Sequence, residues 1–112
     1  MKFLTVMAFL IATPALAEVR NFQTFAVEAS GVKFWLPSTF VVKKGDVVKI
    51  TATSKIPGKN SVHGLAIDAF KIQEVADTKG KTVEFTADKA GIFEIRCHLH
   101  PPHVGGQLIV LE

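Results

Sequence analysis

After Asn21, hydrophobic and polar positions alternate with a period of two, in short segments separated by Gly, Pro, Asp and Lys. Such alternation is typical of strands that bury one face and expose the other. In the segment 46–53, for example, Val48, Ile50 and Ala52 share one face and polar side chains take the other. No stretch combines the length and the 3.6-residue period of a helix. The pattern predicts an all-β fold.

The segments expected to form strands are bounded by turn residues, and 55–61, with its Pro57-Gly58 pair, is expected to be a loop. The segment 71–76 is expected to be an irregular edge or a short strand. Short strands at this spacing favour a β-sandwich or barrel. The expected strands are 22–28, 33–36, 39–42, 46–53, 62–67, 71–76, 81–87, 92–97 and 107–111.

The first 17 residues differ from the rest of the chain. Met1-Lys2 is followed by the apolar run 3–12, which is too short to span a bilayer, and then by Ala15-Leu16-Ala17 before the polar Glu18. This order is typical of a cleavable secretory signal peptide. A buried first strand or an uncleaved anchor explains the basic start and the small residues less well. We therefore predict cleavage between Ala17 and Glu18, a single domain over 18–112, and a periplasmic location.

The charge of the chain disfavours nucleic acid as a partner. The 112 residues carry 13 Lys and Arg against 10 Asp and Glu. The basic residues are spread singly, with Lys43-Lys44 as the one adjacent pair, so the sequence does not favour nucleic acid. An exported chain with a single cysteine has no internal disulfide. Cys97 is therefore a free thiol, an intermolecular partner or a metal ligand.

The candidate chemistry is concentrated in the segment 96–106. It contains Cys97, three of the four histidines and the stiffening pair Pro101-Pro102. Alternation along 92–97 places Cys97 on the core side of its strand. A thiolate with nearby imidazoles is a donor set that suits copper or zinc, and any further imidazole must come from His63.

These residues resemble those of the cupredoxin family of copper proteins. The motifs are Lys43-Lys44-Gly45-Asp46, Val62-His63-Gly64, Gly80-Lys81-Thr82, Ala90-Gly91-Ile92-Phe93 and Arg96-Cys97-His98-Leu99-His100. The resemblance implies a Greek-key β-sandwich or barrel of about seven to eight strands. The family also includes the copper domain of cytochrome oxidase subunit two, which has a second cysteine where this chain has Pro101. The resemblance therefore implies a single copper ion.

The spacing Cys97-x-x-His100-x-x-His103 resembles the amicyanin loop, with histidine in place of the axial methionine. The resemblance implies His63, Cys97 and His100 as the copper ligands. Met1 and Met7 both lie in the predicted signal peptide, so His103 is the first candidate for the axial position. An axial imidazole binds Cu(II) more strongly than a thioether does, which predicts a green or red, low-potential site.

Other assignments remain open. Cys97, His103 and Gln107 have a spacing similar to that of azurin, in which case Gln107 would be the axial donor and His100 a rim residue. His98 is expected to be exposed, or to admit metal or electrons. Zinc is the alternative metal.

The predicted function is one-electron transfer by an exported copper protein, with an unidentified redox partner. Copper tolerance or delivery, with a copper donor or acceptor as partner, is the alternative. A small-molecule enzyme similar to nitrosocyanin is disfavoured, because that protein has a carboxylate where this chain has His63, and because the sequence offers no acid–base pair. We expect no membrane insertion after cleavage, and the sequence leaves the oligomeric state open.

Overall fold

The computed structural model describes residues 16–58, 61–99 and 103–112, and strands occupy most of this part of the chain. It contains no α-helix within those residues, and its short 3₁₀ turn η2 covers Asp68–Phe70. The all-β prediction is confirmed. The strands are β1 (Val19–Ala29), β2 (Val32–Leu36), β3 (Thr39–Lys43), β4 (Val47–Ser54), β5 (His63–Ile67), β6 (Ile72–Ala76), β7 (Lys81–Thr86), β8 (Gly91–Ile95), β9 (His103–Val104) and β10 (Gly106–Leu111).

Each of the segments expected to be a strand is a strand, and the structure adds β9, which has only two residues. With β9 and the short β6 counted separately, the labelled strands number more than the expected seven to eight. The strand β1 also begins earlier than expected, at Val19 instead of Phe22. It is longer because it pairs in parallel with β4 from Val19↔Val47 to Ala26↔Ser54.

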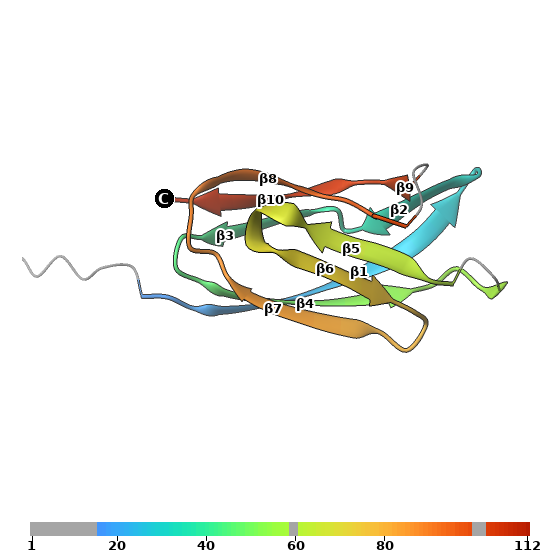
Figure 1. Ribbon diagram of the computed structural model, residues 1–112, viewed down its shortest axis with the longest axis horizontal. Coiled ribbons are helices and arrows are strands. Elements are labelled where there is room, and N and C mark those ends of the chain that lie inside the picture. The colour runs from blue at the N-terminus through green and yellow to red at the C-terminus, as the bar shows by residue number, and fades with distance from the viewer. Residues whose placement is uncertain (1–15, 59–60, 100–102) are drawn as a thin grey trace, which may run out of the picture.

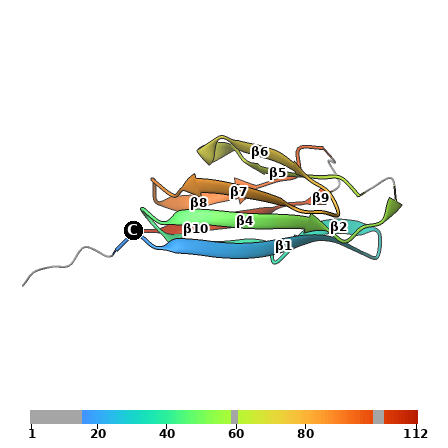
Figure 2. The same cartoon turned by 90° about the horizontal axis from the view of Figure 1, so that it is seen from below.

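The strands form three sheets that curl around one core (Figures 1 and 2). The largest sheet has the order β7-β4-β1-β2-β9, the second has the order β3-β10-β8, and β5 pairs with β6. Three neighbouring pairs are parallel: β1 with β4, β3 with β10, and β2 with β9. Parallel neighbours cannot be joined by a tight hairpin, so the chain crosses between sheets, as in a Greek-key sandwich.

The core lies between these sheets and follows the alternation seen in the sequence. Along β4, Val48, Ile50 and Ala52 are fully buried, as expected. Along β7 and just beyond it, Val83 and Ala87 are buried while Glu84 and Thr86 are exposed. The largest fully buried apolar side chains are Trp35, Ile50, Leu65, Ile67, Ile95 and Leu108.

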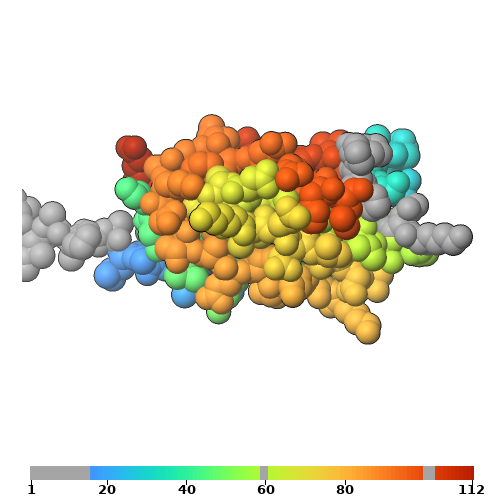
Figure 3. All heavy atoms as spheres, viewed as in Figure 1, coloured from blue at the N-terminus to red at the C-terminus, as the bar shows by residue number. Residues whose placement is uncertain are grey.

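The hairpin of β5 and β6 lies along one side of the molecule, and β5 is its buried strand, with all of its residues inside (Figure 2). An isolated bridge joins it to the end of β8. The Ala66 amide donates to the Arg96 carbonyl at 2.8 Å and the Arg96 amide donates back at 2.9 Å. The space-filling view shows the chain after β8, in orange-red, lying against β5, in yellow-green (Figure 3). The bridge fixes the position of the next residue, Cys97, relative to β5.

The predicted signal peptide falls almost entirely in residues 1–15, outside the described part of the chain, so the cleavage site stays a prediction. Over the described ranges, no helix is both long enough and apolar enough to cross a bilayer.

Candidate metal centre

His63 is the first residue of β5, and its side chain is fully buried. The strand begins directly after an exposed Val62 and runs into the core, because every residue from His63 to Ile67 is covered. Pairing with β6 places His63 opposite Ala76. The imidazole therefore enters the molecule on a strand held from both sides, by β6 and by the bridge to β8.

Cys97 follows the bridge residue Arg96 and is buried, as the alternation along 92–97 predicted. Its sulfur lies against the start of β5, where the backbone N–H of Gly64 donates a hydrogen bond to Sγ at 3.1 Å. This contact ties the Cys97 sulfur to the main chain of β5, beside His63.

His103 arrives on β9, which exists because it pairs in parallel with β2, Lys33↔His103 and Phe34↔Val104. Its side chain is buried. The ring Nδ1 lies 3.1 Å from the carbonyl oxygen of Val104, an oxygen that can only accept. Nδ1 therefore carries the proton, and the lone pair of the neutral imidazole is on Nε2.

These three side chains converge. One ligand atom from each of His63, Cys97 and His103 lies within 4.8 Å of the others, and the residues are 0%, 8% and 7% exposed. Two atoms bonded to one copper or zinc ion at about 2.3 Å are at most about 4.6 Å apart. Inward shifts of roughly an ångström would bring the three donors to bonding distance. A thiolate and imidazoles that are almost fully buried fit such an ion.

The remaining sequence candidates are placed differently. His100 lies outside the described residues. Gln107 is exposed on β10, while its neighbour Leu108 faces the core, which disfavours Gln107 as an axial donor to a buried ion. His98 was expected to be exposed, but it is half-buried. Its imidazole covers Gly64, so a Cβ added there would lie 2.5 Å from Nδ1.

Trp35 is the residue whose role the sequence did not reveal. It is a core residue, 1% exposed. Its ring also lies beside both buried imidazoles, with centroid distances of 6.2 Å to His63 and 5.6 Å to His103. Nothing in the sequence around Trp35 indicates this position, because it depends on the pairing of β2 with β9.

An ion pair next to the cluster holds η2 to the end of β8. The Arg96 guanidinium donates to both carboxylate oxygens of Asp68, at 3.0 and 3.1 Å. This hydrogen bonding lowers the pKa of Asp68 and raises that of Arg96. Both side chains are substantially exposed, so the pair contributes more to orientation than to stability.

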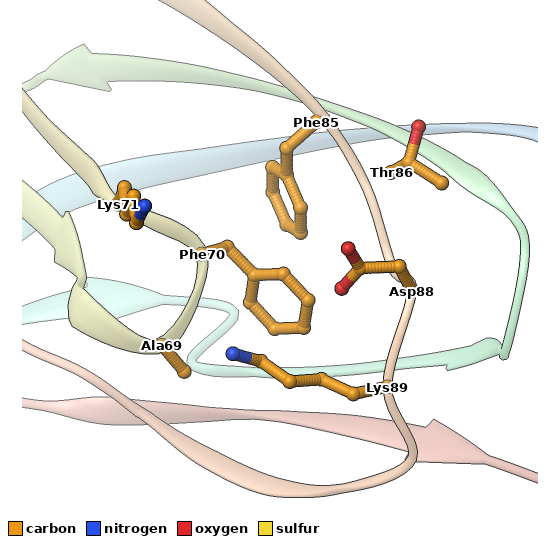
Figure 4. Close-up of a pocket in the computed structure, with 7 residues that line it drawn as sticks. All are labelled: Ala69, Phe70, Lys71, Phe85, Thr86, Asp88 and Lys89. Carbon is orange, nitrogen blue, oxygen red and sulfur yellow. The ribbon is translucent and has the colours of Figure 1, made fainter.

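A separate hollow of about 330 Å³ lies near the start of β8, before Gly91 (Figure 4). The His–Cys cluster, formed by His63, Cys97 and His103, includes the segment after the other end of β8. Lys89 Nζ lies over the Phe70 ring, 5.1 Å from its centroid, across this hollow. None of its lining residues belongs to the His–Cys cluster. They are Ala69, Phe70, Lys71, Phe85, Thr86, Asp88 and Lys89.

A family model described as a cupredoxin-like domain matches residues 2–110. The chain belongs to the cupredoxin-like domain family. This confirms the resemblance drawn from its motifs.

Solved structures show the same fold. The chain is 21% identical to the multicopper oxidase mgLAC, with a TM-score of 0.65, over 85% of this chain and 39% of the oxidase. It is 25% identical to the Cu-containing nitrite reductase of Thermus scotoductus SA-01, with a TM-score of 0.61, over 85% of this chain and 28% of the reductase. It thus spans about two fifths of the oxidase and less of the reductase.

The metal-binding domain of the Cu(I)-exporting P-type ATPase CopA of Streptococcus pneumoniae D39, solved with Cu(I), is similar in size. The chain is 20% identical to it, with a TM-score of 0.60, over 80% of this chain and 96% of that domain. This chain therefore has the fold of these copper proteins, and its own His63, Cys97 and His103 form a candidate metal site.

Proposed function

We propose that this protein is an exported mononuclear copper protein that transfers single electrons. The observation that carries the proposal is the convergence of His63, Cys97 and His103 within 4.8 Å in the interior of a cupredoxin-like domain. When bound, copper would supply a Cu(II)/Cu(I) couple. One thiolate with several imidazoles favours copper over structural zinc, which more often uses paired cysteines.

Each proposed ligand would have its own role in holding the copper ion. Cys97 supplies the thiolate, and the Gly64 amide keeps that sulfur in place. His63 supplies an imidazole from a buried strand, and His100, from the loop, is proposed as the second one. His103 is proposed as the fourth donor, through the Nε2 that the Val104 contact leaves with its lone pair. His63 and His103 lie on paired strands and would move little during electron transfer.

Export is part of the proposal. It is supported by the basic, apolar and small-residue order of residues 1–17. The mass of the protein recovered from the periplasm tests it directly, since cleavage after Ala17 leaves a chain that begins at Glu18. Recovery of the uncleaved mass in the cytoplasm alone would overturn this part and leave the copper site untouched.

Copper binding can be followed through the protein's own fluorescence. Trp35 is the only tryptophan and there is no tyrosine, so the intrinsic emission reports a ring that is 5.6 Å from His103. We expect Cu(II) to quench this emission and the quenching to saturate at one equivalent. Cys97→Ser and His63→Ala should lose the tight phase, while Glu94→Gln, a change at an exposed position on β8, should keep it. Equal quenching in all variants would contradict the site.

The axial assignment predicts colour. With a strong His103 donor, the copper-loaded protein should be green or red and low in potential. His103→Met should move its main absorption toward that of a blue site and raise the potential. An unchanged spectrum in His103→Met would exclude His103 from the coordination sphere.

Copper delivery or tolerance is the second candidate, supported by the similarity to nearly the whole CopA metal-binding domain, a structure solved with Cu(I). The two functions differ in how firmly Cu(I) is held. A carrier retains copper through repeated reduction and oxidation in the presence of a Cu(I) chelator. Rapid loss of Cu(I) to that chelator would favour delivery.

A further inference from the structure

Trp35 contacts the candidate metal centre in three ways. Its ring meets His63 edge-on, with an interplanar angle of 81°, and lies against His103 at 45°. Its indole Nε1–H donates a hydrogen bond of 3.1 Å to the carbonyl oxygen of Gly64. Trp35 therefore contacts two of the proposed ligands directly. It is also hydrogen-bonded to Gly64, whose N–H contacts the third, Cys97.

Gly64 is held at both of its polar main-chain groups. Its N–H donates to Cys97 Sγ at 3.1 Å, and its carbonyl accepts from Trp35. The His98 imidazole fills the space beside its Cα. Because one residue carries both hydrogen bonds, a shift of the carbonyl away from Trp35 would also turn the N–H away from the sulfur.

We propose that Trp35 is a positioning residue of the metal centre. It fixes the Gly64 N–H on the Cys97 sulfur and sets the orientation of the His63 and His103 rings. The part of this inference that concerns a bound ion rests on the proposed function. The part that concerns the Gly64 amide does not.

If Trp35 only filled space in the core, it would not need a hydrogen-bond donor. Any large apolar side chain can fill core volume, but only one with a donor can satisfy the buried Gly64 carbonyl, and an unsatisfied buried carbonyl is costly. Trp35→Phe keeps an aromatic ring and removes the N–H. Replacement of this single tryptophan by benzothienylalanine keeps the bicyclic shape and removes only the donor.

The first test uses the copper-free protein and the hydrogen exchange of the Gly64 amide, measured by NMR relative to the amide of Ile50 in the core strand β4. We expect this relative rate to rise roughly tenfold in Trp35→Phe and in the benzothienylalanine protein. Phe40→Leu is the matched control, because Phe40 is a buried core aromatic, 3% exposed, that packs against Phe22. It should leave the ratio unchanged.

A ratio that is unchanged in both Trp35 variants would show that the residue only fills the core, and would overturn the proposal. The isosteric variant protects this conclusion if Trp35→Phe does not fold.

The second test uses the Cu(II)-loaded protein and the position of its thiolate-to-copper charge-transfer band. Loss of the Trp35 donor should shift this band, since the hydrogen bond to sulfur changes the donor strength of the thiolate. Phe40→Leu should not shift it. If no variant, including the unchanged chain, shows such a band, the copper proposal fails while the exchange result still decides the role of Trp35. A band that does not move when the exchange ratio rises would overturn the link to the metal centre.

Discussion

Gly64 is the residue at which contacts from two distant parts of the chain meet. Cys97 and His98 come from the segment after β8, and Trp35 comes from β2. The need for glycine is steric, because a Cβ would lie 2.5 Å from the His98 Nδ1 and 2.8 Å from its backbone nitrogen. A side-chain ring can turn away, but the backbone nitrogen moves only with the chain after Cys97.

Gly64→Ala should therefore separate β5 from the Cys97 segment. We expect it to lower the free energy of unfolding by about 1–3 kcal/mol, as overpacking of a buried position does. It should also speed alkylation of the Cys97 thiol at constant pH. Chemical denaturation and thiol-labelling rates measure the two effects.

Gly31→Ala is the control for Gly64→Ala. Nothing lies within 4 Å of its added Cβ, so its cost comes only from the φ of +77°. It should leave the labelling rate unchanged. Normal labelling in Gly64→Ala would show that the segment adapts and that glycine is not required.

Sequence reasoning identified the candidate ligands better than the residues that surround them. Alternation alone placed Cys97 inside, and His63 was the one histidine outside the loop, so both predictions were specific. The contacts of Trp35 and His98 were not predictable in this way. They depend on which strands become neighbours, and strand pairing is a long-range property that local pattern does not encode.

At the scale of elements, the carboxylate of Asp46 links the turn after β3 to the residue that precedes β1. Asp46 ends the turn between β3 and β4 and is fully buried. Its Oδ2 accepts from the Lys43 amide at 2.9 Å, and its Oδ1 accepts from the Glu18 amide at 3.0 Å, just before β1. The sequence marked the turn Lys43-Lys44-Gly45-Asp46, but not the reach to β1, since the two segments are far apart in the chain.

The hydrogen bonds from Glu18 and Lys43 lower the pKa of the Asp46 carboxyl below its ordinary 3.8. Because the folded pKa is the lower one, the stabilisation is complete above about 3.8 and is lost as pH falls through the folded value. Asp46→Asn should thus lower the melting temperature by a few degrees at neutral pH, on the order expected for a lost main-chain cap. The difference should shrink below about pH 3.8.

Asp88→Asn removes the same charge at an exposed position and serves as the control for Asp46→Asn. It should have little effect at either pH. Thermal unfolding of the full chain between acidic and neutral pH measures all three proteins. A pH-independent loss in Asp46→Asn would mean that the carboxylate charge is not what stabilises the turn.

At the scale of the whole molecule, the cupredoxin-like domain has a core that lies well inside the predicted mature domain. Among the described residues, the buried core runs from Ala26 to Val110. In the described part of the chain, the Glu18 amide donates to Asp46, while Leu16 and Ala17 are exposed. The predicted cleavage point thus lies directly before an amide that is hydrogen-bonded to the Asp46 carboxylate.

Cleavage between Ala17 and Glu18 would turn the Glu18 amide, which donates to Asp46, into a charged ammonium at the same position. A charge-assisted hydrogen bond is stronger than a neutral one, so a chain that begins at Glu18 should be more stable at neutral pH than the full chain. The gain should fade above about pH 8, as the new amine loses its proton. Melting curves of the two chains, the shorter made by scarless removal of an N-terminal fusion, measure this gain.

Asp46→Asn in both chains decides whether the gain comes from this contact, because without the carboxylate the chain beginning at Glu18 should lose most of its advantage. Acetylation of the Glu18 amine should have the same effect while leaving Asp46 intact. An advantage that persists through both changes would come from loss of residues 1–17 alone. Because the shorter chain is made outside the cell, the result stands whether or not the export proposal holds.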